Sequence, residues 1–259
     1  MSVLTATRHS GFLTGRSVRA LLRQPAFAIM TLVQPVIWLL LFGQLFRSVV
    51  DIPGFAVGGT YLEFLTPGVI IMTALFSSGW AGTVYIADME RGVMDRLLAS
   101  PVSRAAMIVG TMAYQALTTV VQTLVVFAIA LAAGARFAPV GVLVTLVAAC
   151  LISVVVAALS NALALLLRQQ EALIGISQFI VLPLQFVSSA LMDTRLSPGW
   201  VQVVARYNPV DWAVVASRQS LAAVPEWGAV LPRLGWLLLL AVVMCGLATR
   251  AFRSYQRSL

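Results

Sequence analysis

The chain has 259 residues, of which 60% are apolar and only 10% carry a charge, and its mean hydropathy is +0.96. Soluble domains are about 25% charged, so this composition excludes a soluble globular domain, a disordered chain and a disulfide-stapled mini-protein. The remaining class is an all-α polytopic membrane protein. It is too small to combine a bundle of spans with a full-sized soluble catalytic domain, so we expect one transmembrane domain over residues 1–259.

All 17 basic residues are arginine, and the nine acidic residues leave a formal net charge of +8. The arginines cluster between apolar runs, which is typical of topology signals rather than of a nucleic-acid surface. We therefore expect the lipid bilayer, and no nucleic acid, as a partner. Without lysine the chain cannot form a Walker A loop, whose Gly-Lys-Ser/Thr segment cradles phosphates. If ATP drives this protein, ATP and Mg²⁺ must bind to another chain.

The two cysteines and the one histidine offer no catalytic or metal site. Cys150 and Cys245 lie inside apolar runs without a neighbouring ligand at metal-binding spacing. His9 lies outside the apolar runs, which argues against a Ser-His intramembrane protease. A carboxylate-dependent membrane enzyme could use Asp88 and Glu90, but no metal or nucleotide motif accompanies them. We assign no catalytic residue and no metal site, and keep the membrane enzyme as an alternative class.

Six apolar runs are long enough to cross the hydrocarbon core, which takes about 20 residues. We expect spans over residues 25–46, 64–87, 105–135, 139–167, 172–192 and 231–252. With both termini inside, the inner segments hold eleven arginines and the outer segments six. The positive-inside rule therefore predicts that both termini are cytoplasmic.

Two segments outside the spans predict short helices at the membrane surface. Residues 1–24 carry apolar and arginine stripes at helical spacing, which predicts an interfacial helix, with a polar flank as the alternative. On the outer side, residues 193–230 predict two short helices with a break at Asn208-Pro209, and Ser197-Pro198 has the form of an N-cap and first helical residue. Such a re-entrant hairpin must pack on the bundle. The residues that we expect to shape it are Trp200, Arg206, Asn208, Pro209 and Asp211.

The inner connection, residues 88–104, packs six charges into seventeen residues. Its apolar residues Met94, Leu97 and Leu98 repeat at helical spacing before Pro101, which predicts a short amphipathic helix across the ends of spans two and three. An apolar ridge flanked by both charge signs suits docking to a protein. A solvated loop is the alternative.

The span interiors hold essentially no ionisable residue, which counts against an ion-coupled transporter. They hold seven amides instead: Gln34, Gln44, Gln115, Gln122, Asn161, Gln178 and Gln185. Interhelical hydrogen bonds are one interpretation, and a polar lining for an amphipathic substrate is the other. Pro35 and Pro183 predict kinks in spans one and five, so the candidate pathway residues are Gln34, Trp38, Gln178 and Gln185.

Two islands of sequence resemble the ABC-2 type permeases, and most closely their daunorubicin/doxorubicin resistance branch. Residues 88–104, DMERGVMDRLLASPVSR, resemble that family's E-R-G-x-x-[DE]-R-[LM]-L-x-[ST]-P-V-S-R segment. Residues 182–190 (LPLQFVSSA), 198–200 (PGW) and 205–210 (ARYNPV) resemble its second signature, in the expected order. Residues 192–194 (MDT) depart from the aromatic-proline pair that the family often has there.

The resemblance implies the permease subunit of an ATP-driven exporter in a bacterial cytoplasmic membrane, paired with an identical or sibling permease and docked on two ATPase subunits. It implies that residues 90–100 form a coupling helix, with the turn from Arg168 to Glu171 as a secondary contact. The implied ATPase-coupling residues are Glu90, Arg91, Met94, Asp95, Arg96, Leu97, Leu98, Pro101, Arg168 and Glu171. The implied cargo is a hydrophobic drug, polyketide or lipid moved outward, with a lipid-linked glycan as the alternative.

Overall fold

The computed structural model describes residues 32–46, 60–93, 96, 104–191, 194, 197–222 and 224–257. Among these residues every regular element is helical, as the all-α class predicts. The elements are η1 (Trp38–Phe42), α3 (Gly43–Leu45), α4 (Tyr61–Gly79), α5 (Thr83–Glu90), α7 (Arg104–Ala132), α8 (Pro139–Leu167), α9 (Gln170–Phe186), α10 (Gly199–Ala205), α11 (Pro209–Leu221) and α12 (Trp227–Arg257). The predicted interfacial helix over residues 1–24 lies outside the described residues.

Four of the described segments are helices long and apolar enough to cross a membrane: Tyr61–Glu90, Ile108–Ala132, Pro139–Leu167 and Trp227–Phe252. They match the second, third, fourth and sixth predicted spans. The described part of the first run is a shorter apolar helix, Leu32–Leu45. It includes the π-helical turn η1, three residues after the proline that predicts a kink. Six spans therefore stay a prediction.

The fifth predicted run gives a shorter helix than the sequence predicts. The run was expected to reach residue 192, but α9 ends at Phe186 after 17 residues, or about 25 Å. The side-chain amide of Asn208 explains this end, because its Nδ2 donates to the carbonyls of Leu184 and Val187. These are carbonyl groups that a helix terminus leaves without partners.

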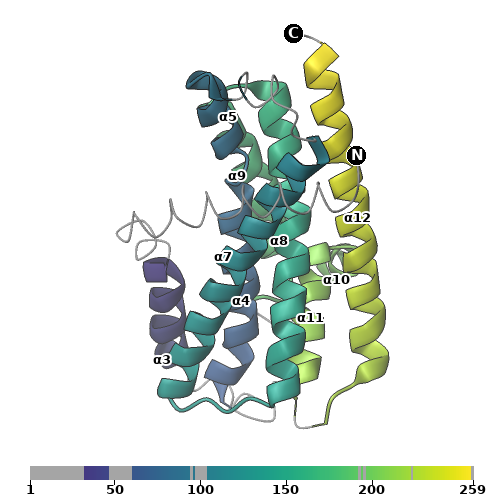
Figure 1. Cartoon of the computed structure of the whole chain (residues 1–259). Helices are drawn as coiled ribbons and strands as arrows, with labels where there is room; N and C mark the ends of the chain where they lie inside the picture. Colours follow the sequence, from purple (N-terminus) through teal and green to yellow (C-terminus); the bar gives the residue numbers. More distant parts are fainter. Residues whose placement is uncertain are drawn as a thin grey trace.

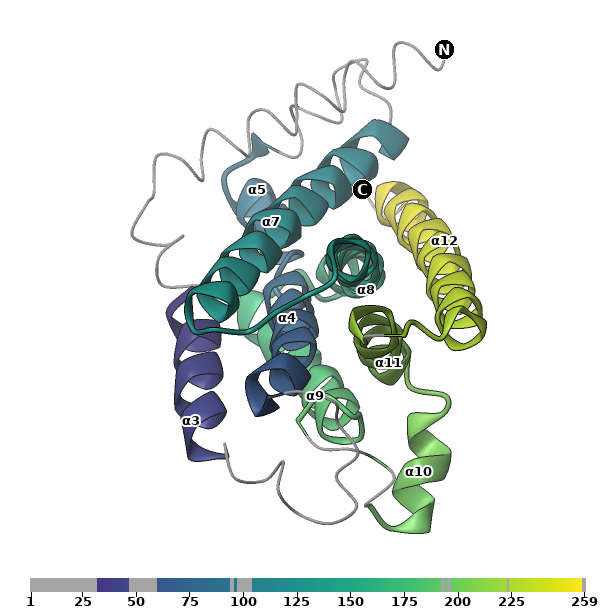
Figure 2. The ribbon, with the colours of Figure 1, turned by 90° about the horizontal axis from the view of Figure 1, so that it is seen from below.

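Helix α8 is the centre of the bundle and packs against α4, α7, α9, α11 and α12. Figure 2 views the bundle along its axis and shows α4, α7, α11 and α12 around it. Small side chains allow this close approach: the buried face of α8 includes Ala148, Ala149, Ala157 and Ala158. The fourth run was predicted at 139–167 and those bounds are confirmed.

The bundle has two ends, named here as they lie in Figure 1. At the upper end, α5 and α8 finish and α12 has its C-terminal turns. At the lower end α4 and α8 begin, and the Glu63 carboxylate accepts the backbone N–H of Arg136 at 2.8 Å. Glu63 was expected to precede span two, but it is the third residue of α4 and completes a capping box with Thr60.

Candidate functional site

The second membrane-crossing segment is interrupted between α4 and α5. In a continuous helix the Gly82 N–H would bond to Ser78 and the Thr83 N–H to Gly79. Here the Ala81 N–H takes the Ser78 carbonyl and the Thr83 N–H takes that of Trp80, both at 3.1 Å. This register shift removes the helical partners of the Gly82 N–H and the Gly79 carbonyl. The predicted second span matches Tyr61–Glu90, but the sequence analysis does not predict this interruption within it.

One hydroxyl of α8 binds both of these backbone groups. Ser160 Oγ donates to the Gly79 carbonyl at 2.7 Å and accepts the Gly82 N–H at 3.0 Å. Hydroxyls of neighbouring helices commonly satisfy broken helices in membranes in this way. A Cβ on Gly82 would lie 2.4 Å from the Ser160 carbonyl oxygen, so only glycine lets the two backbones approach. We call Gly79–Gly82 together with Ser160 the upper break.

The contact at the upper break gives a reference point from which to locate the predicted ATPase-coupling segment along the bundle. From the Gly82–Ser160 contact, α5 and α8 both run to the upper end, and Glu90 and Arg168 each lie eight residues further along. Eight helical residues rise about 12 Å. The start of the predicted coupling segment and the Arg168 turn therefore both lie at the upper end of the bundle (Figure 1).

The described coupling residues form an exposed, charged rim. Its members are Glu90, Arg91, Arg96, Arg168 and Glu171. Two left-handed residues redirect the chain at this rim, Gly92 with φ of 65° and Arg168 with φ of 54°. Asp88, the first residue of the predicted coupling helix over 88–104, belongs to α5, which ends at Glu90. Met94, Asp95, Leu97, Leu98 and Pro101 lie outside the described residues.

Helix α11 starts deep in the bundle and ends at its lower end. Asn208 caps it by accepting the Val210 N–H at 2.9 Å, and Pro209 is its first residue. The predicted break at Asn208-Pro209 is therefore confirmed. The predicted N-cap at Ser197 is wrong, because α10 begins after Pro198 and lacks a side-chain cap. Of the other hairpin residues, Trp200 is exposed, and the carbonyl of Arg206 accepts the indole N–H of Trp212.

Two contacts show how far α11 penetrates. Near its C-terminus, Ser220 Oγ lies 3.5 Å from the Gly141 carbonyl, close to the start of α8. Near its N-terminus, Pro209 and Val210 line the same cavity as Ile152 and Val156, in the middle of α8. Helix α11 therefore runs from the lower end to about half the depth of α8. This agrees with a re-entrant element surrounded by protein.

Helix α11, which lies in the predicted outer hairpin and not in a predicted span, carries charge into the bundle. Asp211 is 7% exposed and accepts the backbone N–H of Ser189 at 2.8 Å. Arg218 donates to the carbonyls of Phe64 at 3.1 Å and Ala190 at 3.0 Å. Its guanidinium also lies 3.6 Å from the centroid of the Phe64 ring, within cation–π range. The sequence reading missed Arg218, because its partners are backbone groups without a sequence signal.

The four candidate pathway residues do not meet in one site. Gln34 is exposed, Trp38 stacks on Phe42 with centroids 4.6 Å apart, and Gln178 is half-buried. Gln185 Nε2 donates to Met72 Sδ at 2.9 Å. These different environments do not make a shared polar lining.

The other interior amides mostly bond between helices. Gln115 Nε2 donates to Ser77 Oγ at 3.2 Å, and Ser77 Oγ donates to Gln122 Oε1 at 3.2 Å, which joins α4 to α7. Asn161 Nδ2 donates to Thr111 Oγ1 at 3.3 Å, which joins α8 to α7. These contacts favour the interhelical interpretation for the three amides.

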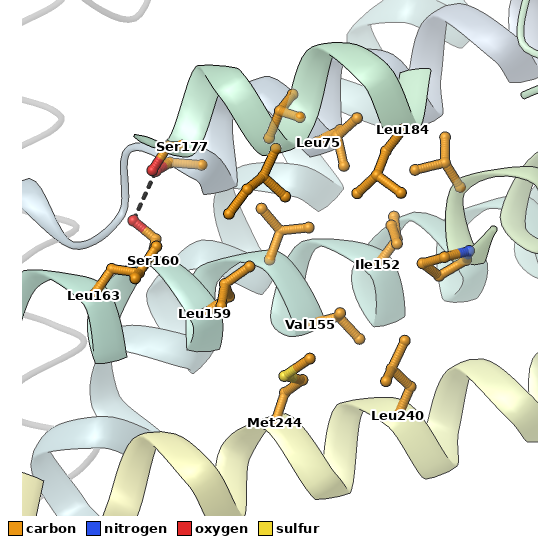
Figure 3. Close-up of a pocket in the computed structure, with 16 residues that line it drawn as sticks. Leu75, Ile152, Val155, Leu159, Ser160, Leu163, Ser177, Leu184, Leu240 and Met244 are labelled. Atoms are coloured by element: carbon orange, nitrogen blue, oxygen red, sulfur yellow. Dashed lines mark hydrogen bonds between the residues drawn. The ribbon is translucent and has the colours of Figure 1, made fainter. Parts of the chain in front are cut away.

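An apolar cavity of about 210 Å³ lies between α4, α8, α9, α11 and α12 (Figure 3). Its floor is one face of α8, whose lining residues are Ile152, Val155, Val156, Leu159, Ser160 and Leu163. Their spacing of three and four is a helical stripe that sequence reading could have found. None of the four pathway candidates lines this cavity. Among the described residues, no group of His, Cys, Asp or Glu could hold a metal ion.

Comparison with known proteins identifies the family. Residues 10–222 match the family described as ABC-2 type transporter. The chain belongs to the ABC-2 type transporter family. It is a multi-pass membrane permease of an ABC transporter, and the predicted permease role, rather than an enzyme, is confirmed at this level.

Several relatives are transport permeases by name. A putative transport permease, ycf38, of Pyropia yezoensis is 30% identical over 213 residues, which cover 81% of this chain and 72% of the relative. The daunorubicin resistance ABC transporter permease protein DrrB1 of Streptomyces coeruleorubidus is 29% identical over 211 residues, 80% of this chain and 72% of the relative. A probable doxorubicin resistance ABC transporter permease protein, DrrC of Mycobacterium tuberculosis, is 24% identical over 185 residues, 70% of this chain and 66% of the relative.

Proposed function

We propose that this permease exports a hydrophobic or amphipathic compound, outward across a bacterial cytoplasmic membrane, with energy from a separate ATPase. The observation that carries the proposal is the exposed charged rim at the upper end. Three elements, α5, α8 and α9, bring Glu90, Arg168 and Glu171 to this end. The printed names of the two resistance relatives support a drug-like cargo.

In the proposed assembly, two permease chains pair and two ATPase subunits dock on their upper ends, which face the cytoplasm. Each chain has six spans and both termini cytoplasmic, as the arginine distribution favours. ATP and Mg²⁺ bind to the ATPases, since this chain lacks lysine and therefore a Walker A loop. This chain itself catalyses no bond chemistry.

The proposed coupling acts through the rim and the upper break. ATP draws the two ATPase subunits together, and the coupling segments move with them. Helix α5 transmits this movement to the bundle at Gly79–Gly82, where the α4–α5 helix is already interrupted. ATP can shift the permease only if it binds the two arrangements unequally, because a ligand shifts an equilibrium by its differential affinity.

A charge-reversed pair of variants tests the docking surface. The double variant Asp95→Arg with Arg96→Asp keeps the net charge but exchanges the positions of the two charges. A complementary docking surface on the ATPase would then meet like charges. The matched control, Arg206→Glu with Glu226→Arg, reverses two exposed charges that lie away from the upper end. The tagged variants are purified in mild detergent from the native host, and co-purifying proteins are identified by mass spectrometry.

The expected result is that a Walker-containing ATPase accompanies the wild type and the control variant but not the upper-end variant. A second permease in the wild-type sample would identify a heterodimer. If the sample has the mass of a dimer and contains no second permease, the dimer is a homodimer. Retention of the ATPase by a well-folded upper-end variant would overturn the assignment of the coupling segment.

A further inference from the structure

The apolar cavity has the form of a groove that opens beside exposed membrane-depth surface. The floor of the groove is α8. Its sides are formed by Ile180 and Leu184 of α9 and by Leu240 and Met244 of α12, and Leu75 and Gly79 of α4 also line it. The neighbours of these side-wall residues are exposed and apolar, with Phe179 80% and Leu239 52% exposed. Apolar surface therefore continues from the groove onto the faces of α9 and α12.

The position of the groove matches one leaflet of a bilayer. Along α8 it extends from Ile152 to Leu163, eleven residues or about 17 Å. Half of the hydrocarbon core is about 15 Å thick. Leu163 lies four residues before the end of α8, so the groove occupies the upper half. Pro209 and Val210 of the re-entrant α11 lie in its lining and limit it toward the lower half.

The chemistry of the lining selects an apolar ligand. Of the sixteen lining residues only Ser160 and Ser177 have polar side chains. The Ser160 hydroxyl already binds Gly79 and Gly82 of the upper break. A polar ligand would lose its water without finding replacement hydrogen bonds, which is costly. An apolar cavity of about 150 Å³ stays dry and accepts small hydrocarbons, and this groove is larger.

We propose that this groove binds one acyl chain of a membrane lipid, admitted sideways between α9 and α12 from the leaflet at the upper end. The bound chain lies against Gly79 and Ser160, the two residues that hold the upper break. An amphiphile in the groove therefore stabilises one arrangement of α5 relative to α8. This last step rests on the proposed export function, whereas the binding site itself does not.

Photo-crosslinking tests the site with the chain alone. The purified chain is placed in nanodiscs of phosphatidylcholine that contain a small fraction of phosphatidylcholine with a diazirine in the middle of one acyl chain. After illumination, mass spectrometry locates the labelled residues. We expect labels on α8 between Ile152 and Leu163 as well as on the exposed faces of α9 and α12.

Two adjacent leucines of α12 give a matched pair of variants. Leu240 lines the groove, and Leu239 is exposed beside it. A tryptophan in the groove occupies the volume that a lipid chain would fill, so a bound chain would have to displace it. The label on α8 should therefore fall about tenfold in Leu240→Trp and stay unchanged in Leu239→Trp. Leu159→Trp, which fills the groove from its floor, is the second groove variant in case the first fails to fold.

Labels confined to the exposed faces, or labels on α8 that persist in both groove variants, would overturn the proposal. Its failure is distinguishable from that of the export function. Groove labelling in a chain that never co-purifies with an ATPase would retain the lipid site and contradict export. A co-purifying ATPase without groove labelling would support the export function and contradict the lipid site.

Discussion

Two interruptions of helical structure at membrane depth stand out in the part of the chain that the structure describes, and different side chains hold the two. At the upper break a single hydroxyl, that of Ser160, binds both free backbone groups. At the lower junction, where α9 ends and α11 begins, three side chains bind backbone groups. They are the amide of Asn208, the carboxylate of Asp211 and the guanidinium of Arg218. Hydrogen bonds to charged groups are stronger than neutral ones. We therefore expect the lower junction to stay fixed while the upper break moves.

The largest effect should come from removing the guanidinium of the lower junction. Arg218→Met loses two hydrogen bonds to backbone carbonyls and the stacking on Phe64. The free energy of unfolding should fall by about 3 kcal/mol or more, measured by SDS titration in mixed micelles. Arg218→Lys keeps the positive charge but not the planar guanidinium that bonds to both carbonyls. It should therefore recover only part of the lost unfolding free energy. An unfolding free energy within error of the wild type would contradict the role given to Arg218.

The next largest effect should follow from a methyl group at the upper break. In Gly82→Ala the Cβ would meet the Ser160 backbone, whereas in the control Gly175→Ala it would meet nothing within 4 Å. We expect Gly82→Ala to cost about 1–3 kcal/mol of unfolding free energy and to weaken ATPase stimulation. Gly175→Ala should be nearly neutral. Equal behaviour of the two variants would show that the close approach at Gly82 has no energetic consequence.

A smaller effect is expected from the hydroxyl of the upper break. Ser160→Ala removes the bonds to Gly79 and Gly82, at a cost of about 1–2 kcal/mol. Ser153→Ala is the matched control, since Ser153 is also buried on α8 but bonds only within its own helix, to Cys150. Hydrogen exchange should accelerate over residues 79–90 in Ser160→Ala and not in Ser153→Ala. Protection that is unchanged in both would remove Ser160 from the account of the break.

The smallest effect should come from the amide network between α4 and α7. Gln115→Leu loses the bond to Ser77, which should cost about 0.6 kcal/mol, the average for such bonds in membrane helices. The same SDS titration measures it. A cost as large as that of Arg218→Met would mean that interior amides, and not the lower junction, fix the bundle.

Local sequence signals predict the parts of this fold that depend on neighbouring residues. The run 139–167 is continuous, apolar and opened by Pro139, and α8 has those bounds. Asn208-Pro209 combines a capping side chain with a residue suited to a first helical turn, and α11 begins there.

Features with distant causes could not be predicted in the same way. The apolar run 64–87 looks unbroken, because the side chain that satisfies its break is Ser160, 78 residues beyond Gly82. Helix α9 ends early because Asn208 reaches back to its last carbonyls. Arg218 bonds to the backbone carbonyls of Phe64 and Ala190. Every residue has such a carbonyl, so residue type does not indicate which ones Arg218 will reach.

The most direct test of the contrast between the two ends measures two distances in one complex. Spin labels are placed on Arg91 and Leu166 at the upper end, and on Tyr207 at the lower junction and Val140 at the lower end, all exposed positions, in a chain with both cysteines replaced by alanine. Distances are recorded by pulsed EPR in the permease purified with its ATPase, with and without ATP. The account predicts that the upper distance changes on ATP binding and the lower one does not. A constant upper distance, or a change confined to the lower pair, would contradict it.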